Sequence, residues 1–224
     1  MSWRELPPLT TGVGDLLPDL PRIALVAGPV ADHRCALWAA ERPALEGVVA
    51  ARAREFSTGR YLARCAMVDA GLRPAAIPRG GNRAPAWPPG MIGSITHAGE
   101  VAVAGAAPAD AAGGLGIDLE RVDRVTANLH RRLFTPAERA HLDPADRRTA
   151  GLVFSAKEAG YKAVNPRVGR FIGFQEAEVT LDPERGTFRL HYVGDHAPNA
   201  VMNDGVGYFC FFRQYVLTLF VIPA

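Results

Sequence analysis

The chain has 224 residues, of which 48% are hydrophobic and 21% are charged, and its formal net charge is +2. This length and composition suffice for a buried core, either as one large domain or as two small lobes. The small net charge creates no strong field toward nucleic acid or an anionic membrane. The three cysteines lie far apart and form no CxxC pair, so neither a zinc site nor a disulfide framework is indicated.

We expect no membrane or export signal at either end of the sequence. The N-terminal segment MSWRELPPL lacks a basic stretch followed by an apolar run, so we expect no signal peptide. The apolar stretch over residues 215–224 is about half the length of a membrane span. We therefore expect a cytoplasmic protein that binds neither membrane nor nucleic acid. A two-lobed chain needs no partner to complete a cleft, so we also expect a monomer.

The first half of the chain shows alternating apolar runs and breakers. These patterns predict, in chain order, a strand over residues 22–30, a helix over 38–70, a loop over 72–91, and strands over 92–96 and 101–106. The helix should be interrupted near Pro43. The loop is rich in proline and glycine, which favour extended and turning backbone.

The second half begins after a connection of small residues over 108–114. The predicted elements are a strand over 115–120, a helix starting at the Thr135–Glu138 capping box, a helix over 151–164 and hairpins over 176–193 and 206–222. Asn165 and Pro166 should end the second helix. Strand, helix and strands thus occur twice, which predicts an α+β fold with two halves, residues 1–110 and 111–224. No sequence repeat relates these halves.

Two acids stand in alternation within the segment Gly116–Glu120. On a strand, Asp118 and Glu120 point to the same face, while Ile117 and Leu119 point to the other. Like charges on one face repel unless a cation joins them. Carboxylate oxygens, completed by water and substrate phosphate, suit Mg²⁺. A solvated pair of acids remains the alternative reading of this segment taken alone.

The chain has 25 lysine and arginine residues, but only two of them are lysines, Lys157 and Lys162. Lysine retained in an arginine-rich chain indicates a place where a compact ammonium is required. On a helix, Phe154, Glu158, Tyr161 and Lys162 share one face. An ordinary helical Glu–Lys pair is the alternative, and the rarity of lysine weakens it.

Two further segments offer groups that bind phosphate. His97 ends a short predicted strand beside Thr96, where both can donate to a phosphate oxygen. Arginines repeat every four residues with Phe56 along the first helix, at Arg52, Arg60 and Arg64. The following loop adds Arg79 and Arg83. A structural histidine and a solvated arginine face are the alternatives.

Together, four motifs resemble the Sfp/EntD-type 4′-phosphopantetheinyl transferases. They are REFSTGRYLARCAM, RGGNRAPAWPPGMIGSITHAG, GIDLE and FSAKEAGYKA, and they occur in the family's order and approximate spacing. The GSITH segment and the tryptophan-proline loop before it make the EntD-like branch the most similar. Phe154 replaces a tryptophan that often begins the helix motif, an apolar exchange at a packing position.

The resemblance implies a fold, a reaction and a partner. The family fold is a pseudo-twofold pair of α+β halves with coenzyme A in the cleft between them. Its members transfer 4′-phosphopantetheine from coenzyme A to a serine of an apo acyl or peptidyl carrier protein, in fatty-acid, polyketide, nonribosomal-peptide or siderophore synthesis, and release adenosine 3′,5′-bisphosphate. An acidic carrier would meet a local basic face, for which the candidates are Arg121, Arg124, Arg131 and Arg132.

The resemblance also implies roles for single residues. The ligands of Mg²⁺, or of Mn²⁺, would be Asp118, Glu120 and Glu158. The groups binding coenzyme A and its phosphates would be Arg52, Arg60, Arg79, Thr96, His97, Lys157, Tyr161 and Lys162. Within that set the catalytic groups would be Glu158, Lys162 and His97. Either Glu158 or a water on the metal would take the serine proton, and we favour Glu158.

Two other functions compete with this one. A magnesium-dependent phosphohydrolase or nuclease explains the three acids but leaves the arginine helix and the lysine pair less explained. A non-catalytic nucleotide-binding module predicts that coenzyme A binds without turnover.

Overall fold

The computed structural model describes residue 20, residues 22–81 and residues 83–224. The N-terminal segment in which no signal peptide is expected lies outside these residues. The chain divides into two compact units, Met1–Ala112 and Gly113–Ala224, which we call unit 1 and unit 2. Among the described residues, no helix has the length and apolarity that a membrane crossing requires.

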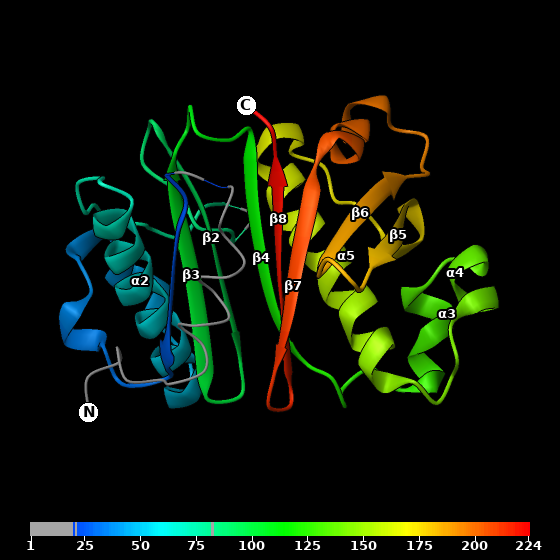
Figure 1. The fold of residues 1–224 in the computed structure, drawn as a ribbon. Helices are drawn as coiled ribbons and strands as arrows, with labels where there is room; N and C mark the ends of the chain where they lie inside the picture. Colours follow the sequence, from blue (N-terminus) through cyan, green and yellow to red (C-terminus); the bar gives the residue numbers. More distant parts are fainter. Residues whose placement is uncertain (1–19, 21, 82) are drawn as a thin grey trace. The chain divides into compact units, whose positions relative to one another are not determined.

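Unit 1 is a small antiparallel sheet covered by one long helix (Figure 1). Its strands are β1 (Ala24–Pro29), β2 (Met91–Ala98) and β3 (Val101–Pro108), in the order β1-β3-β2. The helix α2 (Ala50–Asp69) packs against all three strands. Every residue of the central strand β3 is buried, so its sequence VAVAGAAP is apolar throughout rather than alternating. The core of unit 1 joins Leu62 and Met67 of the helix to the alanines of β3.

The predicted interruption of the first helix is confirmed. A 3₁₀ helix over Ala39–Leu45 contains Pro43 and is separated from α2 by residues 46–49. A further 3₁₀ turn, Arg34–Ala36, was not predicted. In the described part of the predicted 72–91 loop, Arg79 and Pro85 form an isolated bridge, and the last residue, Met91, belongs to β2.

Unit 2 contains a larger antiparallel sheet. Its strands are β4 (Gly114–Arg121), β5 (Ala177–Asp182), β6 (Thr187–Tyr192), β7 (Val206–Phe212) and β8 (Tyr215–Ile222). The strand order is β4-β8-β7-β6-β5, so both predicted hairpins are confirmed and the strand with the two acids lies at an edge. In the register of β4 with β8, Asp118 stands opposite Thr218.

The helices of unit 2 are α3 (His130–Leu133), α4 (Pro136–His141) and α5 (Arg147–Val168). Short 3₁₀ helices cover Ala127–Leu129, Phe174–Glu176 and Ala197–Asp204. The capping box at α4 is confirmed, because Thr135 Oγ1 accepts from Glu138 N at 3.2 Å and Glu138 Oε2 accepts from Thr135 N at 2.8 Å. Sequence patterns did not predict α3 or these 3₁₀ helices.

The predicted bounds of α5 were wrong at both ends. The helix begins four positions earlier than residue 151, because Asp146 caps it by accepting from Thr149 N at 2.9 Å. It also continues through Pro166, which lies in the last turn, where the missing N–H disturbs little of the helix. The helix ends only at Gly169, whose φ of 72° is readily adopted by glycine.

The contact between α5 and β4 is unusually close. A Cβ at Gly116 would overlap the carbonyl oxygen of Ala159, and one at Gly114 would lie 2.6 Å from that of Ala163. Glycine and alanine therefore let the helix backbone approach the strand backbone. This contact sets the separation of the carboxylates on β4 from that of Glu158 on α5.

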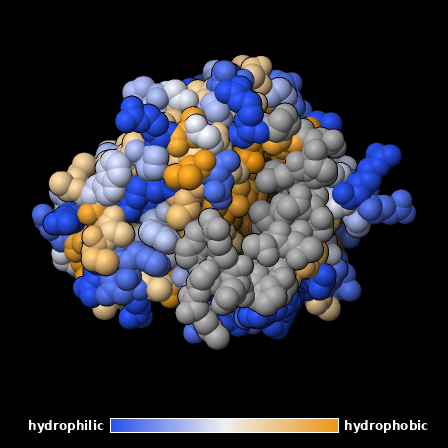
Figure 2. Space-filling view, turned by 60° about the vertical axis from the view of Figure 1, so that its left-hand side comes forward, coloured by the Kyte–Doolittle hydropathy of each residue, from blue (hydrophilic) through white to orange (hydrophobic). Residues whose placement is uncertain are grey.

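The visible surface is mixed in polarity. In the view of Figure 2, blue hydrophilic residues are interspersed with smaller orange hydrophobic areas. Large apolar side chains are exposed singly, as is normal for globular proteins, and those described are Trp38, Val49, Val68, Phe171 and Val193.

Candidate functional site

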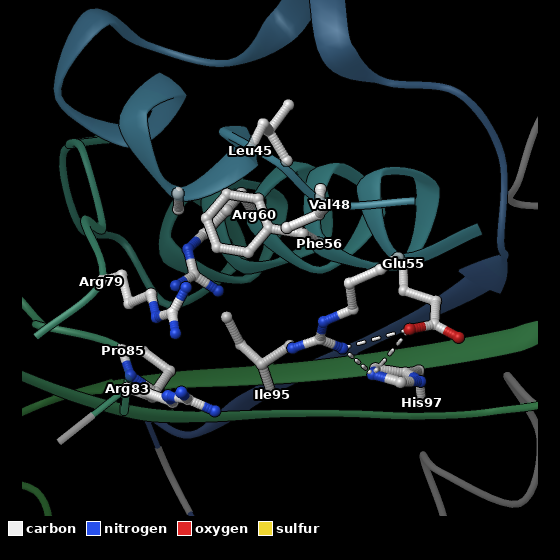
Figure 3. Close-up of a pocket in the computed structure, with 12 residues that line it drawn as sticks. Leu45, Val48, Glu55, Phe56, Arg60, Arg79, Arg83, Pro85, Ile95 and His97 are labelled. Carbon is white, nitrogen blue, oxygen red and sulfur yellow. Dashed lines mark hydrogen bonds and ion pairs between the residues drawn. The ribbon is translucent and has the colours of Figure 1, made fainter. Parts of the chain in front are cut away.

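Unit 1 has a cavity of about 420 Å³ with a cationic lining. Arg52 and Arg60 come from α2, Arg79 and Arg83 from the following loop, and His97 from β2 (Figure 3). The structure thus brings together four of the residues predicted to bind coenzyme A, and adds Arg83. Four guanidinium groups around one cavity suit a ligand with several phosphate oxygens.

Arg60 is held firmly in the wall of this cavity. The residue is only 5% exposed, its Nε donates to the carbonyl of Ile77 at 2.6 Å, and its guanidinium lies 4.2 Å from the centre of the Phe56 ring. Burial is the main cause that lowers the pKa of Arg60 to about 10. In Figure 3 the guanidinium groups of Arg60 and Arg79 extend toward the same space. An anion in that space would offset the cost of burying the Arg60 charge.

His97 lies beside Arg52 at the other end of the cavity. Arg52 Nη1 lies 2.7 Å from His97 Nε2 and 3.1 Å from Glu55 Oε2. Arginine has only donors, so Nε2 is the acceptor of this hydrogen bond, and Nε2 also lies 3.5 Å from Glu55 Oε2. Sequence reasoning missed Glu55, although its i+3 spacing from Arg52 on a helix was a usable signal.

Two residues of the predicted phosphate-binding segments do not line the cavity. Thr96 is buried and lies on the face of β2 opposite to His97, since neighbouring strand residues alternate. Arg64 Nη1 instead donates to both carboxylate oxygens of buried Glu41, at 2.7 and 2.9 Å. Glu41 Oε1 also accepts from Ile77 N at 2.9 Å, so this ion pair holds the start of the loop that carries Arg79.

Unit 2 gathers the predicted acids where β4 meets α5. Asp118 and Glu120 are 7% and 6% exposed. Asp118 Oδ1 accepts from Lys162 Nζ at 2.6 Å, and Asp118 Oδ2 accepts from Ser155 Oγ at 2.9 Å. Both oxygens of Asp118 are therefore held by residues of α5. Glu120 Oε1 accepts from Arg121 N at 2.8 Å.

Ser155 and Thr218 form a fully buried hydroxyl pair behind Asp118. Their oxygens are 2.9 Å apart, and Thr218 Oγ1 also lies 3.0 Å from the carbonyl oxygen of Ser155. The pair fixes the carboxylate orientation from the core side. Sequence reasoning missed both residues: Ser155 stands inside the FSAKEAGYKA motif, whereas no local pattern marks Thr218.

The electrostatics of this group favour an added cation. Burial raises the pKa of Glu158, the charges of Asp118 and Glu120 raise it further, and Lys162 lowers it. Burial also raises the pKa of Glu120. Carboxylates that resist ionisation in each other's presence are stabilised by a divalent cation.

The described residues contain no group of three or more histidine, cysteine, aspartate or glutamate side chains already arranged around a metal position. The donor set nevertheless fits Mg²⁺ chemically, since Asp118, Glu120 and Glu158 offer oxygens from two rigid elements and interact electrostatically. The ammonium of Lys162 supplies one positive charge to this group through its ion pair with Asp118.

The two lysines do not lie together. Lys162 belongs to the acidic group, whereas Lys157 is 3% exposed and its Nζ donates to Leu133 O, Glu138 Oε2 and Phe174 O. The predicted phosphate contact of Lys157 therefore has no hydrogen left to make it in this arrangement. Tyr161 follows Glu158 on α5, and its ring packs edge-on against the exposed Phe171 at 5.3 Å.

Fold and side chains thus define an α+β protein with a cationic cavity in unit 1 and a buried acidic group in unit 2. Residues 40–107 match the family model of the 4′-phosphopantetheinyl transferase N-terminal domain. Residues 114–219 match the model of the 4′-phosphopantetheinyl transferase superfamily.

Characterised relatives agree with these matches. The 4′-phosphopantetheinyl transferase PptT of Mycobacterium tuberculosis is 37% identical over 147 residues, which are 64% of this chain and 65% of PptT. The transferase Npt of Nocardia iowensis is 35% identical over 150 residues, covering 66% of this chain and 68% of Npt. Enterobactin synthase component D of Salmonella typhi is 31% identical over 150 residues, covering 64% of this chain and 61% of that protein.

The chain belongs to the 4′-phosphopantetheinyl transferase superfamily, which confirms the resemblance seen in its motifs. The matched stretch spans less than two thirds of PptT and of enterobactin synthase component D.

Proposed function

We propose that this protein transfers 4′-phosphopantetheine from coenzyme A to a serine of an apo acyl or peptidyl carrier protein, with Mg²⁺, and releases adenosine 3′,5′-bisphosphate. The observation that carries this proposal is the arginine cavity of unit 1. A phosphohydrolase that used the same acids would not require a cavity with four guanidinium groups. Membership of the transferase family supports the same choice.

Coenzyme A carries a 3′-phosphate and a diphosphate, and the cavity offers donors for both. Arg60 and Arg52 bind the 3′-phosphate in this proposal, while Arg79 and Arg83 line the side toward the adenine. His97 contacts the diphosphate. Arg52 is half-exposed, so its guanidinium can turn from His97 toward a phosphate without disturbing the core.

The acidic group of unit 2 would bind the metal ion and support the transfer step. Asp118, Glu120 and Glu158 would hold Mg²⁺, which neutralises charge on the diphosphate as the transfer proceeds. The serine oxygen forms a bond to the phosphorus that carries pantetheine, and the bond from that phosphorus to the bridging oxygen breaks. Glu158 accepts the serine proton, and Lys162 donates to the oxygens on which charge develops.

The carrier partner would be recognised by charge. The net charge of +2 requires a local basic surface rather than a general one. Arg131 and Arg132 are exposed after β4 and fit this role, whereas Arg121 is already paired with Asp123 at 2.7 Å and Arg124 with Glu120 at 3.6 Å. Because rim charges act mainly on the association rate, their loss should slow carrier modification most at low salt.

The test is incubation with coenzyme A, Mg²⁺ and a panel of apo carriers, followed by intact-mass measurement of each carrier. We expect a gain of one phosphopantetheine group on at least one carrier. The Asp118→Asn variant, with folding checked by circular dichroism, should bind coenzyme A but give no gain.

Phosphate release from coenzyme A without carrier modification would instead support a phosphohydrolase. Binding of coenzyme A without any product would support a non-catalytic module.

A further inference from the structure

Lys157 lies in a tripod of acceptors inside unit 2. Its Nζ donates to Glu138 Oε2 at 2.5 Å, to Phe174 O at 2.7 Å and to Leu133 O at 3.1 Å. An ammonium has three hydrogens, so all of them are used within the fold. The side chain is 2% exposed and that of Glu138 is 9% exposed.

The acceptors belong to different segments that pack around α5. Leu133 ends α3, Glu138 lies in α4, and Phe174 begins the 3₁₀ helix that precedes β5 (Figure 1). Glu138 extends the connection, because its Oε1 accepts from Val179 N of β5 at 3.0 Å. The Lys157–Glu138 ion pair therefore ties α5 to α3, α4 and β5 at one point.

The neighbouring residue on α5 is Glu158. Successive helix residues are about 100° apart around the axis, so Lys157 and Glu158 point in different directions. The three hydrogen bonds of Lys157 hold the orientation of this turn of α5, in addition to the packing of α5 against β4. Lys162, one helical turn after Glu158, donates to Asp118 Oδ1 at 2.6 Å, so Glu158 lies on the face of α5 that is turned toward Asp118.

We propose that Lys157 is a positioning residue: its ion pair with Glu138 locks the rotation of α5 and thereby places Glu158 against the carboxylates of β4. The link to metal binding rests on the proposed function. The locking contact itself rests only on the three hydrogen bonds of Lys157.

This role also explains why a lysine is retained in an arginine-rich chain. An ammonium directs three hydrogens to three acceptors that surround it, whereas a guanidinium presents its donors in one plane. Lys157→Arg would have to place a larger planar group in a closed, three-sided site. A lysine that merely contacts phosphate would tolerate that exchange better.

The experiment is a double-mutant cycle with Lys157→Met, Glu138→Gln and the pair combined. Each single variant leaves a buried charge without its partner, whereas the pair leaves none. The amide introduced by Glu138→Gln keeps one oxygen as an acceptor for Val179 N. For each protein we would measure the melting temperature, Mn²⁺ affinity from the electron paramagnetic resonance signal of free Mn²⁺, and coenzyme A affinity by calorimetry.

We expect each single variant, assayed well below its melting temperature, to bind Mn²⁺ at least tenfold more weakly with coenzyme A affinity unchanged within twofold. The combined variant should recover most of the Mn²⁺ affinity. Lys157→Arg should behave like Lys157→Met, and Arg139→Met, an exposed change on α4, should behave like the parent protein.

Three outcomes would overturn the proposal. Loss of coenzyme A affinity in Lys157→Met alone, without rescue in the pair, would mark Lys157 as a phosphate contact. Full Mn²⁺ affinity in folded single variants would show that the Lys157–Glu138 ion pair does not place Glu158. Lower melting temperatures with unchanged Mn²⁺ affinity would show that this ion pair only stabilises the fold. None of these readouts requires transferase activity, so failure of the proposed function would be seen separately in the carrier assay.

Discussion

Ser155→Ala is the change that tests how the Asp118 carboxylate is held. The Ser155 hydroxyl is fully buried and contacts Asp118 Oδ2 and Thr218 Oγ1, each at 2.9 Å. Hydrogen bonds to charged groups contribute about 1.5–3 kcal/mol, and a buried partner left unsatisfied adds to the cost. We therefore expect the free energy of unfolding to fall by about 2–3 kcal/mol.

The same change should weaken metal binding. Loss of a group that orients a ligand typically lowers metal affinity by about 10- to 100-fold. The assays are urea unfolding without metal and the Mg²⁺ concentration for half-maximal carrier modification, which should rise by a similar factor.

Ser57→Ala is the matched control for Ser155→Ala. Ser57 is also fully buried on a long helix, but its hydroxyl contacts the backbone, accepting from His33 N at 3.2 Å and donating to Arg54 O at 3.2 Å. Neutral hydrogen bonds contribute about 1 kcal/mol, so a smaller loss of stability is expected, with no change in the Mg²⁺ requirement. Equal Mg²⁺ curves for both variants would refute the role given to Ser155.

Three further changes probe the rest of the molecule. Arg52→Gln should weaken coenzyme A binding, measured by calorimetry, roughly 10- to 100-fold, because one charge-assisted hydrogen bond is lost. Arg54→Gln, on the same helix, is the control and should leave coenzyme A binding unchanged. Glu41→Gln should lower the free energy of unfolding by about 3–5 kcal/mol in urea, because the buried Arg64 charge loses its partner; a loss below about 1 kcal/mol would contradict this. Gly116→Ala should destabilise unit 2 by about 1–3 kcal/mol through overpacking and should weaken Mn²⁺ binding; unchanged Mn²⁺ affinity would argue against the backbone contact as the spacer.

Local signals account for the elements that sequence patterns predicted. The break at Pro43, the capping box at Thr135 and the two hairpins each depend on residues close together in the chain. The α3 helix has only four residues, too few for a hydrophobic period to show. The end of α5 was misplaced because a proline signal was given more weight than Gly169, and Pro166 costs little in a final turn.

Some features of the candidate site also follow from the sequence alone, and others do not. Asp118 and Glu120 share a face because strand residues alternate, and this follows from sequence alone. Lys157 and Lys162 point apart for a similar reason, since residues five apart on a helix differ by about 140° in direction. The acceptors of Lys157 do not follow from sequence, since they include carbonyl groups of α3 and of the segment after α5. Thr218 reaches Asp118 only through strand pairing across 100 residues of chain, which no local pattern reveals.

Where α5 crosses β4, main chain meets main chain, because Gly116 leaves nothing between itself and the Ala159 carbonyl. The distance between the acids of the strand and the acid of the helix therefore depends on this backbone contact rather than on intervening side chains. Exchanges of bulky residues elsewhere in the core should therefore change the melting temperature more readily than the spacing of these carboxylates. Thermal stability and the geometry of the acidic group can thus change independently of each other as the sequence drifts.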